Sequence, residues 1–333
     1  MKNKTIMALV LIGMSTGFLS AQSKVGQAGF TFLKIGVGAR TAGMGEAAVA
    51  GVTGASAIFF NPAGLARSEG GQAQFSLNTW IAGIQHQAVA ASYAIDGVGV
   101  VGLSYVGMNY GDDIHYTYVD ASGAEGYSGG KRYSGGTVDV GESAIGVAFS
   151  RAFSDKFSLG AHVKLVSQNL GQNDIVTLEG DAITRENKLG TVAIDFGTLY
   201  YTGIKDLAFG MGLTNFSRDL SYESEKFQLP LTMRTGISMT VLNIGDNQSV
   251  VMGLDALHPR DFNERVHAGL EYKYGTLAAI RAGYKFNYDN EGLTFGAGLN
   301  LNVGGAGVLV DYAYSAFGDY FGNVNRITVG VSF

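Results

Sequence analysis

From residue 72 to the end of the chain, apolar and polar residues alternate with period two in one segment after another. In the segment 156–165, for example, Phe157, Leu159 and Val163 occupy one face of an extended chain, and polar or small residues occupy the other. This alternation indicates strands with one apolar face. About fourteen such segments can be counted by this criterion, near 72–81, 85–95, 97–110, 142–152, 156–169, 190–201, 207–217, 230–242, 248–257, 264–274, 276–287, 292–303, 307–315 and 325–333.

The connections between these segments follow a rhythm of their own. Every other connection is short, such as 95–97, 154–155 and 275, whereas 112–141 and 171–189 are long. Short turns on one side, long loops on the other and an even strand number are typical of an outer-membrane barrel, and about ten residues let a tilted strand cross a bilayer. The sequence therefore predicts an all-β fold, a transmembrane antiparallel β-barrel of about 14 strands. It also predicts that both chain ends lie on the periplasmic side.

Composition supports this prediction. The chain has 50 glycines, 17 tyrosines and 19 phenylalanines, with only 3 prolines and 15% charged residues, which favours a glycine-rich and aromatic barrel over a soluble enzyme. A net charge of −5 argues against nucleic acid as a partner. The absence of cysteine rules out a disulfide framework.

Residues 1–21 have the features of a cleaved signal peptide. Lys2 and Lys4 precede an apolar run, and small residues end it before Gln22. No later run has the length of a membrane helix. We therefore expect a signal peptide at 1–21, an exported outer-membrane protein, a hatch (plug) segment at 22–70 and the barrel at 71–333.

The stretch 30–70 is the part of the mature chain that does not alternate. It contains glycine pairs, an alanine-rich run and an Asn-Pro turn. The inward faces of the predicted strands are rich in Gly, Ala, Ser and Thr, and a fourteen-stranded barrel has a lumen wider than its side chains fill. We therefore expect this segment to lie in the lumen as a plug.

Two interpretations are open for the turn in this plug. Phe59 and Phe60 stand directly before Asn61 and Pro62, and Leu65 follows shortly after. These residues would contact an apolar ligand in the lumen, or they would wedge the plug against the wall.

No catalytic, cofactor or metal site is predicted. The five histidines are far apart at spacings that do not suit metal ligation. The nucleophile-elbow spacing around Ser128 occurs in a loop rich in glycine, where chance explains it. The glycines at 36 and 38 follow no strand, which argues against a nucleotide site.

The chain ends on an alternating strand whose last residue is Phe333. Such an ending is similar to the signal that the barrel-assembly machinery reads. We therefore expect Phe333 to act in assembly.

Residues 32–45 (FLKIGVGARTAGMG) and 55–65 (ASAIFFNPAGL) resemble the amino-terminal signature of the PorV/PorQ family. The second stretch also resembles the hatch of FadL-type hydrocarbon transporters. The resemblance implies a fourteen-stranded outer-membrane barrel that serves type IX secretion in Bacteroidota, with secretion subunits and the C-terminal domains of cargo as partners. The alternative is a FadL-like passive transporter of hydrophobic small molecules, with the ligand in the lumen. Outer-membrane lipid would surround the barrel in either case.

Overall fold

The computed structural model describes residues 26–111, 115–119, 132–137, 140–176, 182–222 and 224–333. Its strands are β1 (Gly71–Thr79), β2 (Gln85–Ile95), β3 (Gly99–Asn109), β4 (His115–Val119), β5 (Arg132–Thr137), β6 (Gly141–Ala152), β7 (Phe157–Val176), β8 (Ala182–Tyr201), β9 (Ala208–Phe216), β10 (Leu220–Ser221), β11 (Lys226–Phe227), β12 (Thr232–Ile244), β13 (Gln248–Pro259), β14 (Arg265–Tyr274), β15 (Ala278–Phe286), β16 (Leu293–Val303), β17 (Ala306–Ala316) and β18 (Asn323–Ser332). Its helices are η1 (Thr31–Lys34), α2 (Ala39–Gly43), η2 (Ala55–Phe59), η3 (Pro62–Arg67), η4 (Ile81–Gly83) and α3 (Gly318–Phe321).

Fourteen of the strands form one closed barrel, in the order β1-β18-β17-β16-β15-β14-β13-β12-β9-β8-β7-β6-β3-β2. All of these neighbours pair antiparallel, and β1 pairs with β18 to close the ring. This confirms the predicted fold. Within the described part of the chain, no helix is long and apolar enough to cross a membrane.

The inner and outer faces of the wall differ as the alternation predicts. On β6, Gly146, Ala148 and Ser150 are buried, whereas Ile145 and Val147 are 57% and 60% exposed. Exposed apolar side chains on the outer face of a closed barrel suit contact with hydrocarbon.

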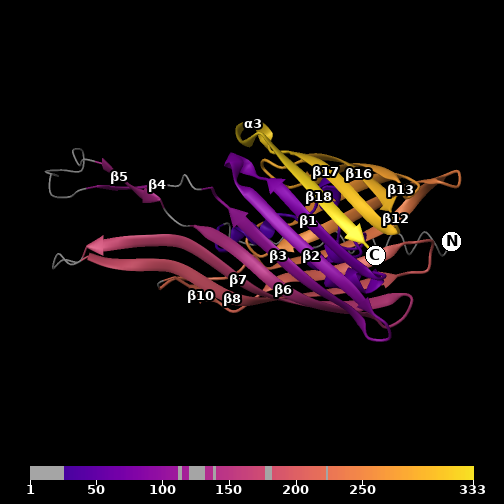
Figure 1. Cartoon of the computed structure of the whole chain (residues 1–333), viewed down its shortest axis with the longest axis horizontal. Helices are drawn as coiled ribbons and strands as arrows, with labels where there is room; N and C mark the ends of the chain where they lie inside the picture. The colour runs from indigo at the N-terminus through magenta and orange to yellow at the C-terminus, as the bar shows by residue number, and fades with distance from the viewer. Residues whose placement is uncertain (1–25, 112–114, 120–131, 138–139, 177–181, 223) are drawn as a thin grey trace, which may run out of the picture.

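The two ends of the barrel are different. We call the end with the short connections, such as 96–98 and 275–277, the turn rim, and the opposite end the loop rim. At the loop rim the long hairpin of β7 and β8 and the β4–β5 ribbon project beyond the other strands, and the C-terminus lies at the other end (Figure 1).

The N-terminal segment, residues 26–70, runs through the interior from the loop rim to the turn rim. At its start, Ala28 bridges to Gln228 in the loop between β9 and β12, and the Gly29 N–H donates to the Gln228 carbonyl at 3.1 Å. At its end, the Gly71 N–H donates to the Phe333 carbonyl at 2.8 Å. The first barrel residue, Gly71, and the last residue, Phe333, thus lie together at the turn rim. Residues 1–25 lie outside the described part of the chain, so the prediction that both chain ends lie on one side stays a prediction.

The apolar side chains of this segment explain the start at the loop rim. Phe30 and Phe32 are 1% and 2% exposed, and they share an apolar cluster with Leu220 and Leu229 of the loop between β9 and β12. The ring of Phe30 also stacks on that of Phe227, with centroids 6.3 Å apart. Burial of these rings stabilises the contact between the segment and the loop.

Candidate functional site in the barrel interior

Glycines on the inner wall mark where the N-terminal segment meets the barrel. A Cβ atom at Gly283 would overlap the backbone nitrogen of Gly45, and one at Gly269 would overlap the carbonyl oxygen of Met44. Only glycine lets two backbones approach so closely. We call this set the wall glycines: Gly160, Gly197, Gly210, Gly212, Gly253, Gly269, Gly283 and Gly296.

The Asn-Pro turn is held by the side chain of Asn61. Its Nδ2 donates to the carbonyls of Val49 at 2.7 Å and Thr198 at 2.9 Å, and its Oδ1 accepts the Ala63 N–H at 3.1 Å. Asn61 is thus the N-cap of η3, with Pro62 at the first helical position, where its missing N–H costs nothing. This residue pair joins two parts of the segment to strand β8.

The aromatic residues before this turn differ in their surroundings. Phe60 is 2% exposed and lies under the Arg234 guanidinium, 5.6 Å from ring centroid to Cζ. Phe59 is half-buried, and both rings line a cavity of about 50 Å³. Leu65 is fully buried beside Ile58 in an apolar cluster. The structure thus shows that Phe59, Phe60 and Leu65 pack inside the barrel. That they contact a ligand stays a prediction.

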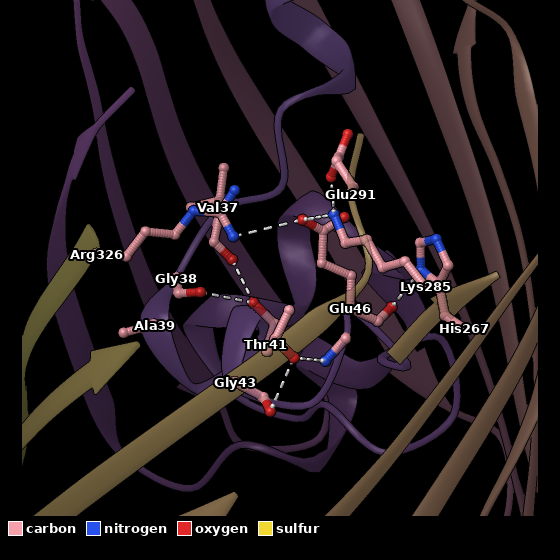
Figure 2. A network of polar contacts seen from close by, with 12 residues as sticks. Val37, Gly38, Ala39, Thr41, Gly43, Glu46, His267, Lys285, Glu291 and Arg326 are labelled. Carbon is pink, nitrogen blue, oxygen red and sulfur yellow. Dashed lines mark hydrogen bonds and ion pairs between the residues drawn. The ribbon is translucent and has the colours of Figure 1, made fainter. Parts of the chain in front are cut away.

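Glu46 is the centre of a buried charge cluster (Figure 2). Its Oε1 accepts from Lys285 Nζ at 2.8 Å and Arg326 Nη1 at 3.5 Å, and its backbone carbonyl accepts from His267 Nδ1 at 3.3 Å. Lys285 also pairs with Glu291 at 2.7 Å. Burial raises the pKa of the Glu46 carboxyl, but the charges of Lys285 and Arg326 outweigh burial and hold that pKa below its ordinary value.

A second charge cluster ties α2 to the wall. Arg40 donates to both carboxylate oxygens of Glu271, at 3.0 and 2.9 Å. Arg281 donates to Glu271 at 2.8 Å and to Asp311 at 2.5 Å. The bidentate contact of Arg40 with Glu271 fixes the orientation of the arginine side chain and also pairs its charge. It therefore holds α2 in one position.

A cavity of about 430 Å³ lies between the N-terminal segment and the loop rim. Phe32, Trp80 and Met108 contribute apolar surface, whereas Arg265 and Glu291 contribute charge. We call this cavity the vestibule. A concave space of this size with mixed lining is suited to a small ligand or to a few side chains of a partner.

A buried Ser-His-Asp arrangement lies on the inner wall and was not among the predicted features. Ser104 Oγ lies 2.8 Å from His162 Nε2, and His162 Nδ1 lies 2.8 Å from Asp195 Oδ2. Lys164 Nζ also contacts Asp195, at 2.9 Å, and the Asn215 N–H donates to it at 2.7 Å. Because Lys164 balances the carboxylate, we interpret the group as an ion pair that joins β3, β7 and β8. Strand register brings these distant residues together, and the only sequence signal is the inward position of His162, Lys164 and Asp195.

Phe333 is the last residue of the closing strand pair. Its N–H donates to the Gly71 carbonyl at 2.9 Å, and its side chain is 72% exposed. We predict that Phe333→Asp lowers the amount of assembled barrel, because a charge replaces the exposed terminal ring while the backbone pairing is kept. Heat-modifiable gel mobility of outer-membrane fractions measures this, with Ser332→Asp as the control. Unchanged mobility and abundance would argue against an assembly role.

The chain matches a known protein family. The model described as type IX secretion system membrane protein PorP/SprF matches residues 132–331, more than half of the chain. The matched part runs from β5 to β18 and excludes the N-terminal segment. No curated protein matches the chain significantly.

Solved structures resemble the chain in fold. The Ralstonia pickettii toluene transporter TbuX aligns with a TM-score of 0.56 at 15% identity, over 89% of this chain and 97% of that one. The Pseudomonas putida toluene transporter TodX gives 0.56 at 14%, over 89% and 96%. The CymD monoaromatic hydrocarbon channel gives 0.53 at 13%, over 90% and 98%. At such low identity these similarities concern the barrel architecture alone.

Proposed function

Because the chain belongs to the type IX secretion system membrane protein PorP/SprF family, we propose that it is an outer-membrane component of type IX protein secretion. In this proposal the leader 1–21 is removed on export, and the N-terminal segment is a hatch that closes the lumen. The finer assignment to PorV/PorQ rests on the resemblance of residues 32–65. In that role the barrel contacts secretion subunits and the C-terminal domains of cargo.

The observation that carries the proposal is that many contacts hold the N-terminal segment to the inner wall of the barrel. Glu46 and Arg40 each bind wall residues through ion pairs, and Asp255 on β13 accepts the N–H groups of Ala48 and Val49 at 2.8 and 2.9 Å. Breaking a buried ion pair is costly, because it leaves a buried charge without its partner. A segment held at so many points favours a scaffold that docks proteins at its loop rim over an open pore.

Deleting the gene is predicted to trap cargo in the periplasm, with its C-terminal signal uncleaved, because a missing docking component stops release and attachment. Immunoblots of cell fractions against one cargo protein measure this. The full-length gene supplied on a plasmid should restore secretion. The proposal fails if cargo is secreted normally in the deletion strain.

The vestibule favours a second function, passive transport of hydrophobic small molecules. Its apolar wall at Phe32 and Trp80 would receive a solute, and Phe59 and Phe60 line a smaller cavity that shares Phe32 with the vestibule. In that case substituting Phe59 with alanine should change uptake of a hydrophobic compound, while removing 120–135 should do little. Residues 120–131 of that loop lie outside the described part of the chain. Normal secretion with defective uptake would favour transport.

A further inference from the structure

The outer edge of β8 has no neighbouring strand near the loop rim. β9 pairs with β8 from Ala208 opposite Tyr201 only as far as Phe216 opposite Ile194. On its other side, β8 continues to pair with β7 to the end of the hairpin. Between 190 and 193, strand pairing among the described residues is therefore one-sided, and alternate backbone groups of β8 face outward from an open edge.

An apolar groove lies along this open edge. A cavity of about 920 Å³ is lined by Val192 and Ile194 of β8 and by Phe216 at the end of β9. Leu165 and Ile145 extend the apolar floor, because Ile145 pairs with Leu165 and Leu165 with Val192 across three strands. These side chains point outward and are 57%, 61% and 47% exposed for Ile145, Leu165 and Val192.

The groove opens away from the lumen. Behind it, Ala193 of β8 and Val166 of β7 are buried in the apolar cluster that also contains Leu220 and Leu229. The loop between β9 and β12 therefore seals the inner side of the gap. What occupies the groove must come from outside the barrel.

We infer that this edge and groove receive an extended segment of a second protein, which adds as a strand antiparallel to β8. An open edge beside exposed apolar side chains needs backbone partners, because hydrocarbon offers none. A strand supplies these partners, and its alternate apolar side chains fill the groove at Val192 and Phe216. The inference rests on the proposed function, and it names the docking surface and the form of the partner.

A second copy of this chain does not fit. Two barrels in one membrane share their orientation, so a symmetric pair is related by an axis along the membrane normal. Each residue of β8 would then lie at the same height as its own copy, with Glu186 near Glu186 and Lys188 near Lys188, both exposed residues. Like charges placed directly opposite destabilise a strand pair. A different protein avoids this clash.

The chain has no cysteine, so a single cysteine with a photocrosslinker reports one position in the native membrane. We predict that Val192→Cys gives a protein adduct, whereas Ile280→Cys, which is 62% exposed on β15, gives lipid adducts only. The crosslinked peptide, identified by mass spectrometry, should be an extended segment with alternating apolar residues. Adding Leu165→Arg should abolish the adduct, and Leu103→Arg, on the outer face of β3, should not.

Four outcomes would overturn the inference: lipid adducts alone at position 192, an adduct with a second copy of the chain, a captured peptide without alternation, or insensitivity to Leu165→Arg. Heat-modifiable mobility checks that each variant has assembled. If the deletion strain traps cargo but position 192 captures no protein, the inference fails and the proposed function stands. If position 192 captures a strand but secretion is normal in the deletion strain, the proposed function fails instead.

Discussion

Gly283→Ala is expected to release the N-terminal segment from the wall or to prevent the barrel from assembling around it. The added methyl would overlap the backbone of Gly45 and Met44. The backbones of β15 and of the N-terminal segment cannot move aside as a flexible side chain would. Overpacking of this kind costs about 3 kcal/mol. Limited proteolysis of the folded barrel should show new cleavage within residues 30–68, together with a lower urea midpoint.

Gly330→Ala is the matched control for this change. Gly330 lies on β18, and its added methyl would meet its nearest atom, the Ala73 carbonyl oxygen, at 3.4 Å, an ordinary contact. Its proteolysis pattern and urea midpoint should stay near those of the unchanged protein. If Gly283→Ala and Gly330→Ala behave alike, the wall glycines do not seat the segment.

The strands were predictable because their signal is local. Alternation at Phe157, Leu159 and Val163 follows directly from the pleat of a strand, and the rhythm of connections then gives the barrel. The N-terminal segment was recognisable as different because glycine, alanine and an Asn-Pro turn break this pattern. Its direction was not predictable, because it depends on the contact of Phe30 with Phe227, residues far apart in sequence.

The contacts inside the barrel depend on the pairing register of neighbouring strands, which is difficult to predict from the sequence. Asn61 was singled out as a turn residue, but its bonds to Val49 and Thr198 require β8 to lie beside the segment. The grouping of Ser104 with His162 likewise depends on strand pairing across β6. The high glycine content indicated that the inner faces of the strands carry small residues. Only the structure shows which of these glycines contact the N-terminal segment.

Glu46→Gln is expected to loosen the N-terminal segment at neutral pH. The carboxylate of Glu46 is 2% exposed and serves both Lys285 and Arg326, which are 5% and 1% exposed. The amide keeps the size of the side chain but leaves these cations without their shared charge, and such a loss costs about 3 to 5 kcal/mol. The urea midpoint of the folded barrel at about pH 7 measures the loss. Glu69→Gln, an exposed change in the same segment, should leave the midpoint unchanged.

The same substitution should alter how stability depends on pH. The folded-state pKa of Glu46 lies below its ordinary value of 4.5, so its carboxylate stabilises the fold above that value. This stabilisation is lost as the pH falls from 4.5 through the lower folded-state pKa, because the unfolded chain then binds the proton first. The unchanged protein should therefore lose stability as the pH falls through this range. Glu46→Gln should lack this part of the loss. Equal acid sensitivity in both proteins would mean that Lys285 and Arg326 do not depend on this carboxylate.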